Sequence, residues 1–396
     1  MKNLVWDEAL ENVEDLVLSF LTQLSEALPD AYSHSDVDLR TASGKKVVLR
    51  LADRTKEYCE GNTPQRQLVF PRQTRGPSAR PFAQLFRVAD LIHEALLDDI
   101  PTTKRDMYYK DVQLFRSQST VDRLVDDLAA TFQLSRADLN VRASSKGLIC
   151  GSGLFIHLKS GDVLNISDSE ASLIPQAEDI ERFQVGEDLA WVLLVEKEAV
   201  FQTLCRLRFA IHEALPGPGL IMTGKGYPDV ATRQLVRTLS DNLPAHVPIL
   251  ALVDGDAYGI DILSVYKHGS TRMQHENEHL AAARIEWLGL WASELSSLGI
   301  DKEALLPITK HDEKKARSML KRRWLPAQWR RELQHMLFSR RKAEIEVLGA
   351  VRASRDADPV LGRDRPAVGG QAGIPLVRYL VAKICAACAD PDHELL

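Results

Sequence analysis

Two aspartates, two residues apart, follow an apolar run in the middle of the chain. Asp254 and Asp256 come directly after Pro-Ile-Leu-Ala-Leu-Val, a run that is typical of a buried strand. Side chains two positions apart in extended chain point to the same side, so both carboxylates leave the strand together. Hard oxygen ligands suit Mg²⁺, which needs few carboxylates and keeps waters or phosphate oxygens. Glu196, at the end of another apolar run, can complete the site; the alternative is a turn beside an unrelated surface glutamate.

A second candidate for chemistry is the tyrosine pair in Lys-Arg-Asp-Met-Tyr-Tyr-Lys, residues 104–110. A tyrosine hydroxyl has an unperturbed pKa of about 10, so it attacks phosphorus only where a base, a cation or a metal favours the phenolate. Arg105 can stabilise a phosphate group with two parallel hydrogen bonds. The alternative for a pair such as Tyr108 and Tyr109 is simple packing of the two rings.

A glycine-containing loop supplies candidate phosphate contacts. The segment from Gly219 to Gly226 has the spacing of an ATPase phosphate loop, but Gly226 stands where that loop needs Ser or Thr for Mg²⁺, so we expect no ATP binding. Lys225 can still approach a phosphodiester, and Tyr227 offers a ring to a sugar or base. Lys146 is a further candidate phosphate contact; ordinary solvated lysine is the alternative for both lysines.

The second half of the chain has the pattern of an α/β domain. Strand-like and helical runs alternate, which predicts βαβ units around a parallel sheet, and ligands bind such sheets at the carboxyl ends of the strands. The candidate acids and the 223–226 loop follow predicted strands. The alternating runs are 190–195, 198–209, 220–223, 230–239, 249–253 and 260–266, followed by basic helices through Lys342, a Gly/Pro/Asp-rich loop near 354–375 and a closing helix near 376–384.

The first half predicts a helical domain. Apolar residues at helical spacing over 4–28 indicate one long acidic amphipathic helix, and the proline-rich segment 31–80 is expected to be an extended connection. Helical periodicity returns later, with Asp111 as a cap and Ser119 or Thr120 as the start of a second helix. A helix-turn-helix with a β-hairpin wing fits this order. The segments concerned are 82–97, 112–132, 147–157 and 162–166, with a turn at Ser160-Gly161.

Composition bounds the class of protein. The 396 residues suit two or three domains, and the five scattered cysteines favour a reduced compartment over a disulfide framework. No apolar run is long enough for a membrane span and the acidic start lacks a signal-peptide layout, so we expect a soluble intracellular protein. The net charge of −5 is unevenly distributed: residues 44–80 hold nine Lys/Arg against three acids, and residues 310–342 hold twelve against three. A polyanionic partner is therefore possible, although solvated helix faces have similar patterns.

Five segments, in order, resemble the catalytic chain of topoisomerase VI, its A chain, and the eukaryotic relative of that chain, the meiotic double-strand-break transesterase. The resemblance spans about residues 80–350 and is closer to the meiotic branch in its Val-Glu-Lys-Glu-Ala-Val-Phe segment. It implies a multi-domain α/β protein, with a winged-helix (CAP-like) DNA-binding domain at 81–178 and a Toprim metal-binding domain with C-terminal helices at 179–396, after an N-terminal helix and basic linker at 1–80. The matching segments are KRDMYY (104–109), SKGL (145–148), VEKEAVF (195–201), TGKGYPD (223–229) and DGDAYG (254–259).

The resemblance also implies roles. The second tyrosine of the pair is the family's nucleophile, which assigns Tyr109 to a 5′-phosphotyrosyl link and the Toprim acids Glu196, Asp254 and Asp256 to Mg²⁺, for which Mn²⁺ can substitute. One tyrosine cuts one strand, so a double-strand break needs a homodimer, in which each tyrosine meets the partner protomer's metal. The implied partners are double-stranded DNA, a topoisomerase VI B-like protein and other meiotic accessory proteins, and the implied location is the nucleus.

Three questions stay open at the level of sequence. A Toprim nuclease or primase would activate water at the metal and would not need Tyr109, whereas an inert DNA-binding assembly protein would need neither the tyrosine nor the acids. The acidic N-terminal helix either binds a protein partner or covers its own domain. Its candidate anchors are Val13, Val17, Phe20 and Leu24.

Overall fold

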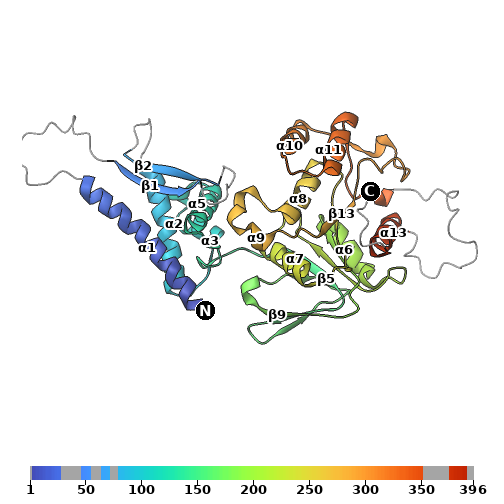
Figure 1. The fold of residues 1–396 in the computed structure, drawn as a ribbon, viewed down its shortest axis with the longest axis horizontal. Coiled ribbons are helices and arrows are strands. Elements are labelled where there is room, and N and C mark those ends of the chain that lie inside the picture. Colours follow the sequence, from blue (N-terminus) through green and yellow to red (C-terminus); the bar gives the residue numbers. More distant parts are fainter. Residues whose placement is uncertain (1, 28–45, 55–63, 72–78, 351–373, 390–396) are drawn as a thin grey trace, which may run out of the picture. The chain divides into compact units, whose positions relative to one another are not determined.

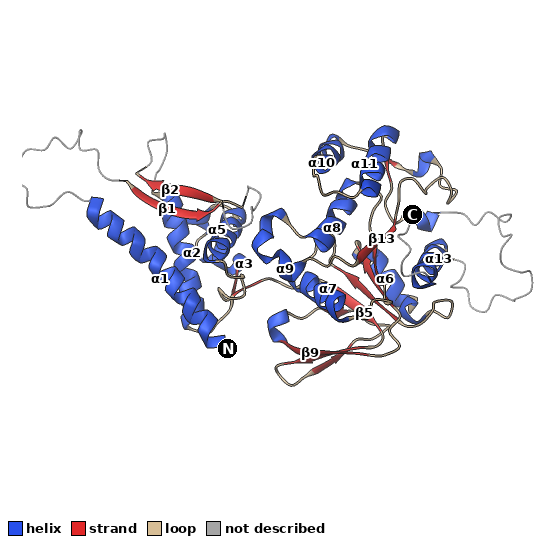
Figure 2. Ribbon diagram, in the orientation of Figure 1, coloured by secondary structure: helices blue, strands red, loops and turns tan. Residues whose placement is uncertain are grey.

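The computed structural model describes residues 2–27, 46–54, 64–71, 79–350 and 374–389. The chain forms two compact units, Met1–Ser144 with Ser270–Glu278, and Ser145–Gly269 with His279–Leu396. Each is described by itself. Figure 1 shows the course of the chain and Figure 2 the distribution of helices and strands. No helix in the described ranges is long and apolar enough to cross a membrane.

The first unit is mainly helical. The long N-terminal helix is confirmed as α1 (Lys2–Ala27). The remaining elements are the strands β1 (Val47–Ala52), β2 (Gln65–Phe70), β3 (Thr102–Thr103) and β4 (Val141–Arg142), and the helices α2 (Arg80–Leu97), α3 (Lys104–Lys110), α4 (Val112–Phe115) and α5 (Gln118–Phe132). One apolar core joins α1, β1, α2 and α5, which fixes the short helices α3 and α4 against it.

Part of the segment expected to be an extended connection is instead an antiparallel hairpin of β1 and β2, with Val47 opposite Phe70 and Ala52 opposite Gln65. Residues 47, 49, 51 and 52 of β1 are buried. The apolar alternation Val47-Leu49-Leu51 was present in the sequence, but the surrounding prolines and charges obscured it. Residues 31–45 of the same prediction lie outside the described residues.

The predicted helix cap is confirmed: Asp111 Oδ1 accepts a hydrogen bond from the Leu114 backbone N at 3.1 Å, at the start of α4. The long helix that follows, α5, starts at Gln118, slightly before the predicted Ser119 or Thr120. Between α4 and α5, Arg116 has a positive φ of 64°, which turns the chain sharply. The predicted helical segments 82–97 and 112–132 therefore correspond to α2 and to the pair α4 and α5.

The hairpin predicted as a wing forms, but it belongs to the second unit. Strands β6 (Leu154–Leu158) and β7 (Val163–Asn165) pair across the 160–161 turn, and β6 also pairs with β9 (Ile180–Val185). The preceding strand β5 (Leu148–Gly151) joins the main sheet, antiparallel to β11 (Gly219–Thr223). The predicted turn and second arm form, but the predicted first arm, 147–157, divides into β5 and β6. The partner strand β9 lies further along the chain and was not predicted.

The second unit is built on a six-stranded sheet in the order β13-β12-β10-β11-β5-β8. The four strands β10 to β13 are parallel, as the alternating pattern predicts, and β5 and β8 extend the sheet in antiparallel fashion. The strand β13 was missed by the sequence analysis. The bounds not yet given are β8 (Ser172–Leu173), β10 (Trp191–Val195), β12 (Ile249–Leu252) and β13 (Ile285–Gly289).

Two apolar cores cover the sheet. On β10, Val192 and Leu194 contribute to one core, whereas Trp191, Leu193 and Val195 contribute to the other, as the alternation of side chains along a strand requires. The first core contains α7 (Val230–Asn242), α8 (Ala257–His268), α10 (Lys310–Leu320) and α11 (Ala327–Ser339). The second contains α6 (Glu198–Arg206) and the predicted closing helix, α13 (Pro375–Ala389).

The remaining short elements are the helices α9 (Asn277–Leu280) and α12 (Val347–Ala350) and the paired strands β14 (Leu306–Pro307) and β15 (Arg341–Lys342). Most of the predicted loop near 354–375 lies outside the described residues. Together these elements confirm the multi-domain α/β class.

Candidate functional site

The tyrosine pair lies on α3 in the first unit, and the two rings differ in environment. Tyr109 is 60% exposed, whereas Tyr108 is half-buried and packs against the core. The Arg105 guanidinium carbon lies 5.8 Å from the centre of the Tyr109 ring. A hydrogen bond with Tyr109 and the attraction between the two groups raise the pKa of Arg105. The structure thus brings Arg105 to Tyr109 and leaves the Tyr109 side chain open to a substrate.

Three contacts fix α3. Thr103 caps its first turn, because its Oγ1 accepts from the Asp106 N at 3.1 Å and donates to Asp106 Oδ2 at 2.7 Å. Met107 is fully buried in the apolar core. Lys104 forms an ion pair with Asp126 of α5, and burial lowers the pKa of Lys104. A short helix anchored at its cap, its middle and its first residue can hold an exposed side chain in a defined direction.

In the second unit, the three candidate acids leave the carboxyl ends of neighbouring strands β10 and β12. Asp254 and Asp256 are only 7% and 6% exposed. The Glu196 Oε2 accepts a hydrogen bond from the Asp254 backbone N at 2.8 Å, and the Asp254 Oδ1 accepts one from the Ile345 N at 2.9 Å. The structure therefore gathers these acids at one edge of the sheet, and a segment about 90 residues later in the chain fastens Asp254.

Asp256 has a structural contact in addition. It is the N-cap of α8, where its Oδ1 accepts from the backbone N of Tyr258 at 2.8 Å and of Gly259 at 2.9 Å. Gly259 itself is required here, because a Cβ at this position would lie 2.3 Å from the Asp254 carbonyl oxygen. The Asp-Gly-Asp-Ala-Tyr-Gly sequence therefore encodes both the carboxylate pair and the tight start of α8.

Glu196 and Asp254 lie in an environment that disfavours their charged forms. Burial, together with the charge of Asp254, raises the pKa of Glu196 to about 8. Burial also raises the pKa of Asp254 to about 6, against the opposing effects of the Ile345 N–H and the Lys197 charge. Buried carboxylates that repel one another favour a bound cation.

Two lysines face these acids in the structure. Lys197 Nζ lies 3.3 Å from Asp254 Oδ2, and Lys342 Nζ lies 3.6 Å from Asp256 Oδ2. Lys197 also pairs with Glu344 and Glu346, at 3.1 and 2.7 Å. Neither lysine was predicted to belong to this site. Lys197 could have been found, since it adjoins Glu196, whereas nothing near Lys342 in the sequence links it to Asp256.

The donor chemistry of this cluster fits a hard divalent cation, because carboxylate oxygens are its preferred protein ligands. Burial, which raises the pKa of Glu196 and of Asp254, disfavours their charged forms unless a cation stabilises them. In the arrangement that the structure shows, however, the lysines and backbone N–H groups engage these oxygens. Over the ranges that the structure describes, no group of three or more His, Cys, Asp or Glu side chains is positioned to hold a metal ion.

The candidate DNA contacts Lys146 and Lys225 are brought together. Lys146 Nζ donates to the Lys225 carbonyl at 3.2 Å, and Lys225 Nζ pairs with Glu198 at 2.9 Å. The loop has positive φ at Lys225 (52°) and Gly226 (84°). Asp229 joins the two segments, because its Oδ2 accepts from the Lys146 N at 2.6 Å while its Oδ1 caps α7. This role of Asp229 was not predicted from the sequence.

The third candidate contact, Tyr227, is half-exposed, and its hydroxyl donates to Asp261 Oδ2 at 2.7 Å. Burial and the neighbouring Asp261 raise its pKa. Its ring therefore remains accessible while its hydroxyl is held in place.

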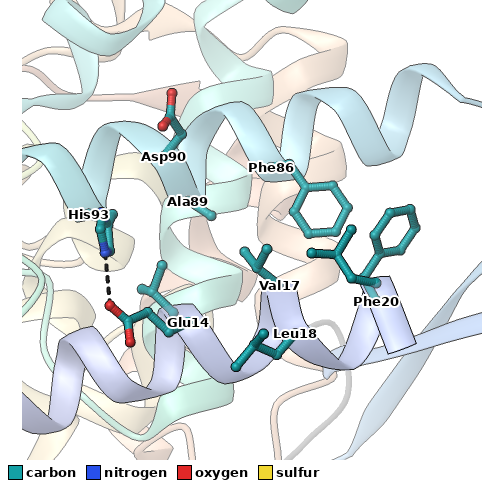
Figure 3. A pocket seen from close by; sticks show the side chains of 10 residues that line it. Glu14, Val17, Leu18, Phe20, Phe86, Ala89, Asp90 and His93 are labelled. Atoms are coloured by element: carbon teal, nitrogen blue, oxygen red, sulfur yellow. Dashed lines mark hydrogen bonds and ion pairs between the residues drawn. The ribbon is translucent and has the colours of Figure 1, made fainter. Parts of the chain in front are cut away.

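The N-terminal helix covers its own unit in part. Ala9 and Val13 are buried, and the Phe20 ring lies 4.5 Å from that of Phe86 and 5.5 Å from that of Phe82 on α2. This supports the alternative of packing onto its own domain for those residues. Beside them, α1 and α2 line an apolar hollow of about 570 Å³, bordered by a 3.1 Å contact between His93 and Glu14 (Figure 3).

Comparison with known proteins places these features in a class. Residues 80–141, which include Tyr109, match the family described as type IIB DNA topoisomerase. Residues 191–356, which include the three acids, match the Toprim domain that the topoisomerase 6 A chain shares with Spo11.

Comparisons with individual relatives support the same family. The chain is 39% identical to the meiotic recombination protein SPO11 of Mus musculus over 274 residues, covering 68% of this chain and 67% of the relative. It is 35% identical to SPO11-1 of Arabidopsis thaliana, covering 84% of this chain and 92% of the relative. It is also 36% identical to the A chain of DNA topoisomerase 6 from Arabidopsis thaliana, over 67% and 61% of the two chains. The chain belongs to the Spo11/topoisomerase VI A family.

Proposed function

We propose that this protein cuts both strands of double-stranded DNA by transesterification and so initiates meiotic recombination. The observation that best supports the proposal is the pairing of an exposed Tyr109 with Arg105 on a helix anchored at both its start and its middle. A packing tyrosine would be buried, as its neighbour Tyr108 partly is. Relatives named as meiotic recombination proteins support the biological setting.

In the proposed reaction, the Tyr109 Oη attacks a backbone phosphorus in line with the departing 3′ oxygen. The Tyr109 proton passes to solvent, the O–P bond to tyrosine forms, and the P–O3′ bond breaks. The departing 3′ oxygen takes up a proton from solvent, so the DNA keeps a 5′-phosphotyrosyl link and a 3′ hydroxyl. Arg105 stabilises the phenolate and the charge that develops on phosphate oxygens, because its guanidinium is always charged and can donate two hydrogen bonds. Phosphoryl transfer depends mainly on such positioning and charge stabilisation.

Glu196, Asp254 and Asp256 are the residues that would hold Mg²⁺, or Mn²⁺ in its place. A bound divalent ion supplies charge stabilisation to phosphate oxygens. The backbone N–H groups of Ile345 and Tyr258 donate to Asp254 and Asp256, respectively, and so orient two of these carboxylates. Lys146, Lys225 and Tyr227 lie beyond the strand ends, where we assign them to the DNA backbone and sugar.

The proposal includes an assembly. A double-strand break requires two tyrosines, so we infer a homodimer on DNA in which the tyrosine of one protomer works with the acids of the other. We further propose a topoisomerase VI B-like protein and other accessory proteins as partners, and the nucleus as the location. The assignment of 81–178 as the DNA-binding segment remains part of this proposal.

A test for covalent attachment decides between this function and its rivals. The protein is incubated with end-labelled duplex DNA and Mg²⁺ or Mn²⁺, denatured, and examined for protein linked to 5′ ends. Covalent adducts are expected. Cleavage without an adduct would identify a metal-dependent nuclease, and binding without cleavage under all conditions, with the proposed partners present, would identify an inert assembly protein.

A further inference from the structure

A buried aspartate in the second unit organises two cations and a tyrosine. Asp261, on α8, is 6% exposed. Its Oδ2 accepts hydrogen bonds from Lys315 of α10 and from the Tyr227 hydroxyl, and its Oδ1 accepts one from Arg322 at 2.8 Å. Because one carboxylate faces two cations, the group keeps a net positive charge.

The same two cations lie beside exposed aromatic rings. Lys315 Nζ is 5.7 Å from the centre of the Tyr258 ring and 6.0 Å from that of Tyr227. The Arg322 guanidinium is 5.5 Å from the centre of the Trp324 ring, which is 48% exposed. We call Tyr258, Lys315, Arg322 and Trp324 the aromatic-basic platform. Its four residues come from α8, α10 and the segment that follows α10.

The platform adjoins the candidate acids. The Tyr258 backbone N donates to Asp256, so the platform begins two residues after that carboxylate. Further exposed basic residues flank it on α10 and the following turn, namely Lys314, Arg317, Lys321 and Arg323. This is the region in which the sequence has twelve Lys/Arg against three acids.

A purely structural role accounts for only part of this arrangement. An aspartate paired with two cations would tie α8 to α10, and the buried carboxylate needs such partners. Stability does not require three aromatic rings to remain exposed beside the cations, since exposed large apolar surface has a cost that burial would remove. The Trp324 ring packs against His268, with 4.7 Å between ring centres, and still remains 48% exposed. Cations next to exposed aromatic rings are typical of surfaces that bind nucleic acid backbones, sugars and bases.

We propose that the aromatic-basic platform is a second DNA contact, which holds the phosphodiester backbone of the duplex beside the candidate acids. Lys315 and Arg322 contact phosphate oxygens, and the rings of Tyr258 and Trp324 contact the adjoining sugars or base faces. This inference rests on the proposed function and extends it by adding binding residues that take no part in bond breakage.

The test measures DNA binding in a Tyr109→Phe background, which removes covalent capture. Binding of a fluorescent duplex is followed by anisotropy over a series of salt concentrations, without Mg²⁺. Lys315→Met removes one charge and keeps most of the side-chain volume, and Trp324→Ala removes one ring without touching Asp261. The matched controls are Lys302→Met, an exposed lysine in the short helical turn at Lys302–Ala304, and Phe338→Ala, an exposed ring on α11.

Lys315→Met is expected to reduce the slope of log K against log salt by about 0.9, the effect of one lost phosphate contact. Trp324→Ala is expected to raise the Kd about fivefold or more. Both controls should bind like the parent, and Trp324→Ala and the controls should keep the parent's melting temperature within a few degrees. Lys315→Met should lower the melting temperature, because the buried Asp261 loses one of its two cations.

Two results would contradict the proposal that the platform contacts DNA. If the parent binds DNA but the platform variants behave like their controls, the residues are structural and the proposed function survives. If the parent does not bind duplex DNA at all, both the platform and the proposed function fail. Should Lys315→Met unfold, the decision passes to Trp324→Ala, whose ring is half-exposed and whose loss leaves the Asp261 contacts intact.

Discussion

Adjacent residues on one short helix have different environments, and this difference is informative. Tyr108 packs against the core of the first unit while Tyr109 projects from it, although both belong to the same Tyr-Tyr pair. From the sequence, the resemblance alone selected the second tyrosine. The structure adds a physical reason, because only Tyr109 is open to a phosphate and adjoins a cation.

Tyr109→Phe is expected to abolish strand cleavage and leave DNA binding within about twofold of the parent, since one contact of an exposed hydroxyl is worth little to affinity. The nucleophilic oxygen is lost but the ring remains. Tyr108→Phe is the matched control and should retain most of the activity. The measurement is covalent adduct formation on labelled duplex, with binding measured in parallel; equal cleavage by the Tyr109→Phe protein and the parent would exclude this nucleophile.

The acids have separable structural and chemical contributions. Glu196→Ala and Asp254→Ala should each reduce cleavage by about 100-fold or more, because metal charge stabilisation amounts to several kcal/mol. Both should weaken Mg²⁺ binding in calorimetric titrations. Unchanged Mg²⁺ binding in these variants and in Asp256→Ala would contradict the site.

Asp256 needs a different comparison, because it also caps α8. Asp256→Ala should lower stability by about 1 kcal/mol through loss of the cap, in addition to a partial loss of cleavage. Asp256→Asn keeps a cap acceptor and should restore stability but not Mg²⁺ affinity. Denaturant unfolding of both variants checks this, and equal stability losses would show that the cap is not the reason.

The helix α1 packs on its own unit and also exposes apolar residues that suit a partner, and the sequence alone could not separate these two roles. Its stripe of apolar residues predicted a helix and a buried face, but burial is uneven: Val13 is covered, whereas Leu18 and Leu21 are exposed. The candidate anchors Val13 and Phe20 belong to the helix's own core contacts. Leu18 and Leu21 form an exposed apolar edge at the hollow shown in Figure 3, and this edge of α1 suits a protein partner.

Leu18→Asp with Leu21→Asp is therefore expected to leave the melting temperature within about 2 °C, because both side chains are already exposed. Capture of a topoisomerase VI B-like protein in a pull-down should be lost. Val13→Asp is the contrasting variant and should lower the melting temperature by many degrees, since it buries a charge. Full partner capture by the double variant would show that this edge is not the contact.

Elements with strong local signals were predicted correctly, and those fixed by distant partners were not. The alternating runs gave β10, α6, β11, α7, β12 and α8 in order, because each is a buried strand or an amphipathic helix in its own right. The strand β13 was not predicted, and the hairpin of β6 and β7, expected beside the preceding helices, lies in the second compact unit. Hydrogen bonds to strands that are distant in the sequence determine the positions of β13 and of this hairpin. Local periodicity does not reveal such bonds.

The same distinction applies to the candidate site. Glu196, Asp254 and Asp256 end apolar runs, which is a local signal with a direct structural meaning. Their partners Ile345 and Lys342 come from the far end of the chain, and Asp261 resembles any acid on a helix until Lys315 and Arg322 are placed beside it. The sequence alone could therefore not predict which distant charged residues pair with one another.

The proposed homodimer, in which each tyrosine works with the acids of the other protomer, predicts a particular result when two inactive variants are mixed. In a heterodimer of Tyr109→Phe with Glu196→Ala, pairing between protomers leaves one break site with an intact tyrosine and intact acids, and the other with neither. The mixed dimer should therefore nick one strand and make no double-strand breaks.

Co-purified heterodimers carrying two different tags, assayed on supercoiled plasmid, provide the measurement. Each variant alone should be inactive, because every site in its homodimer lacks either the nucleophile or a metal ligand. If each tyrosine instead works with the acids of its own chain, every site in the mixture keeps one defect and no nicked plasmid forms. Nicking by the mixture but not by either variant alone would establish that the dimer is the catalytic unit.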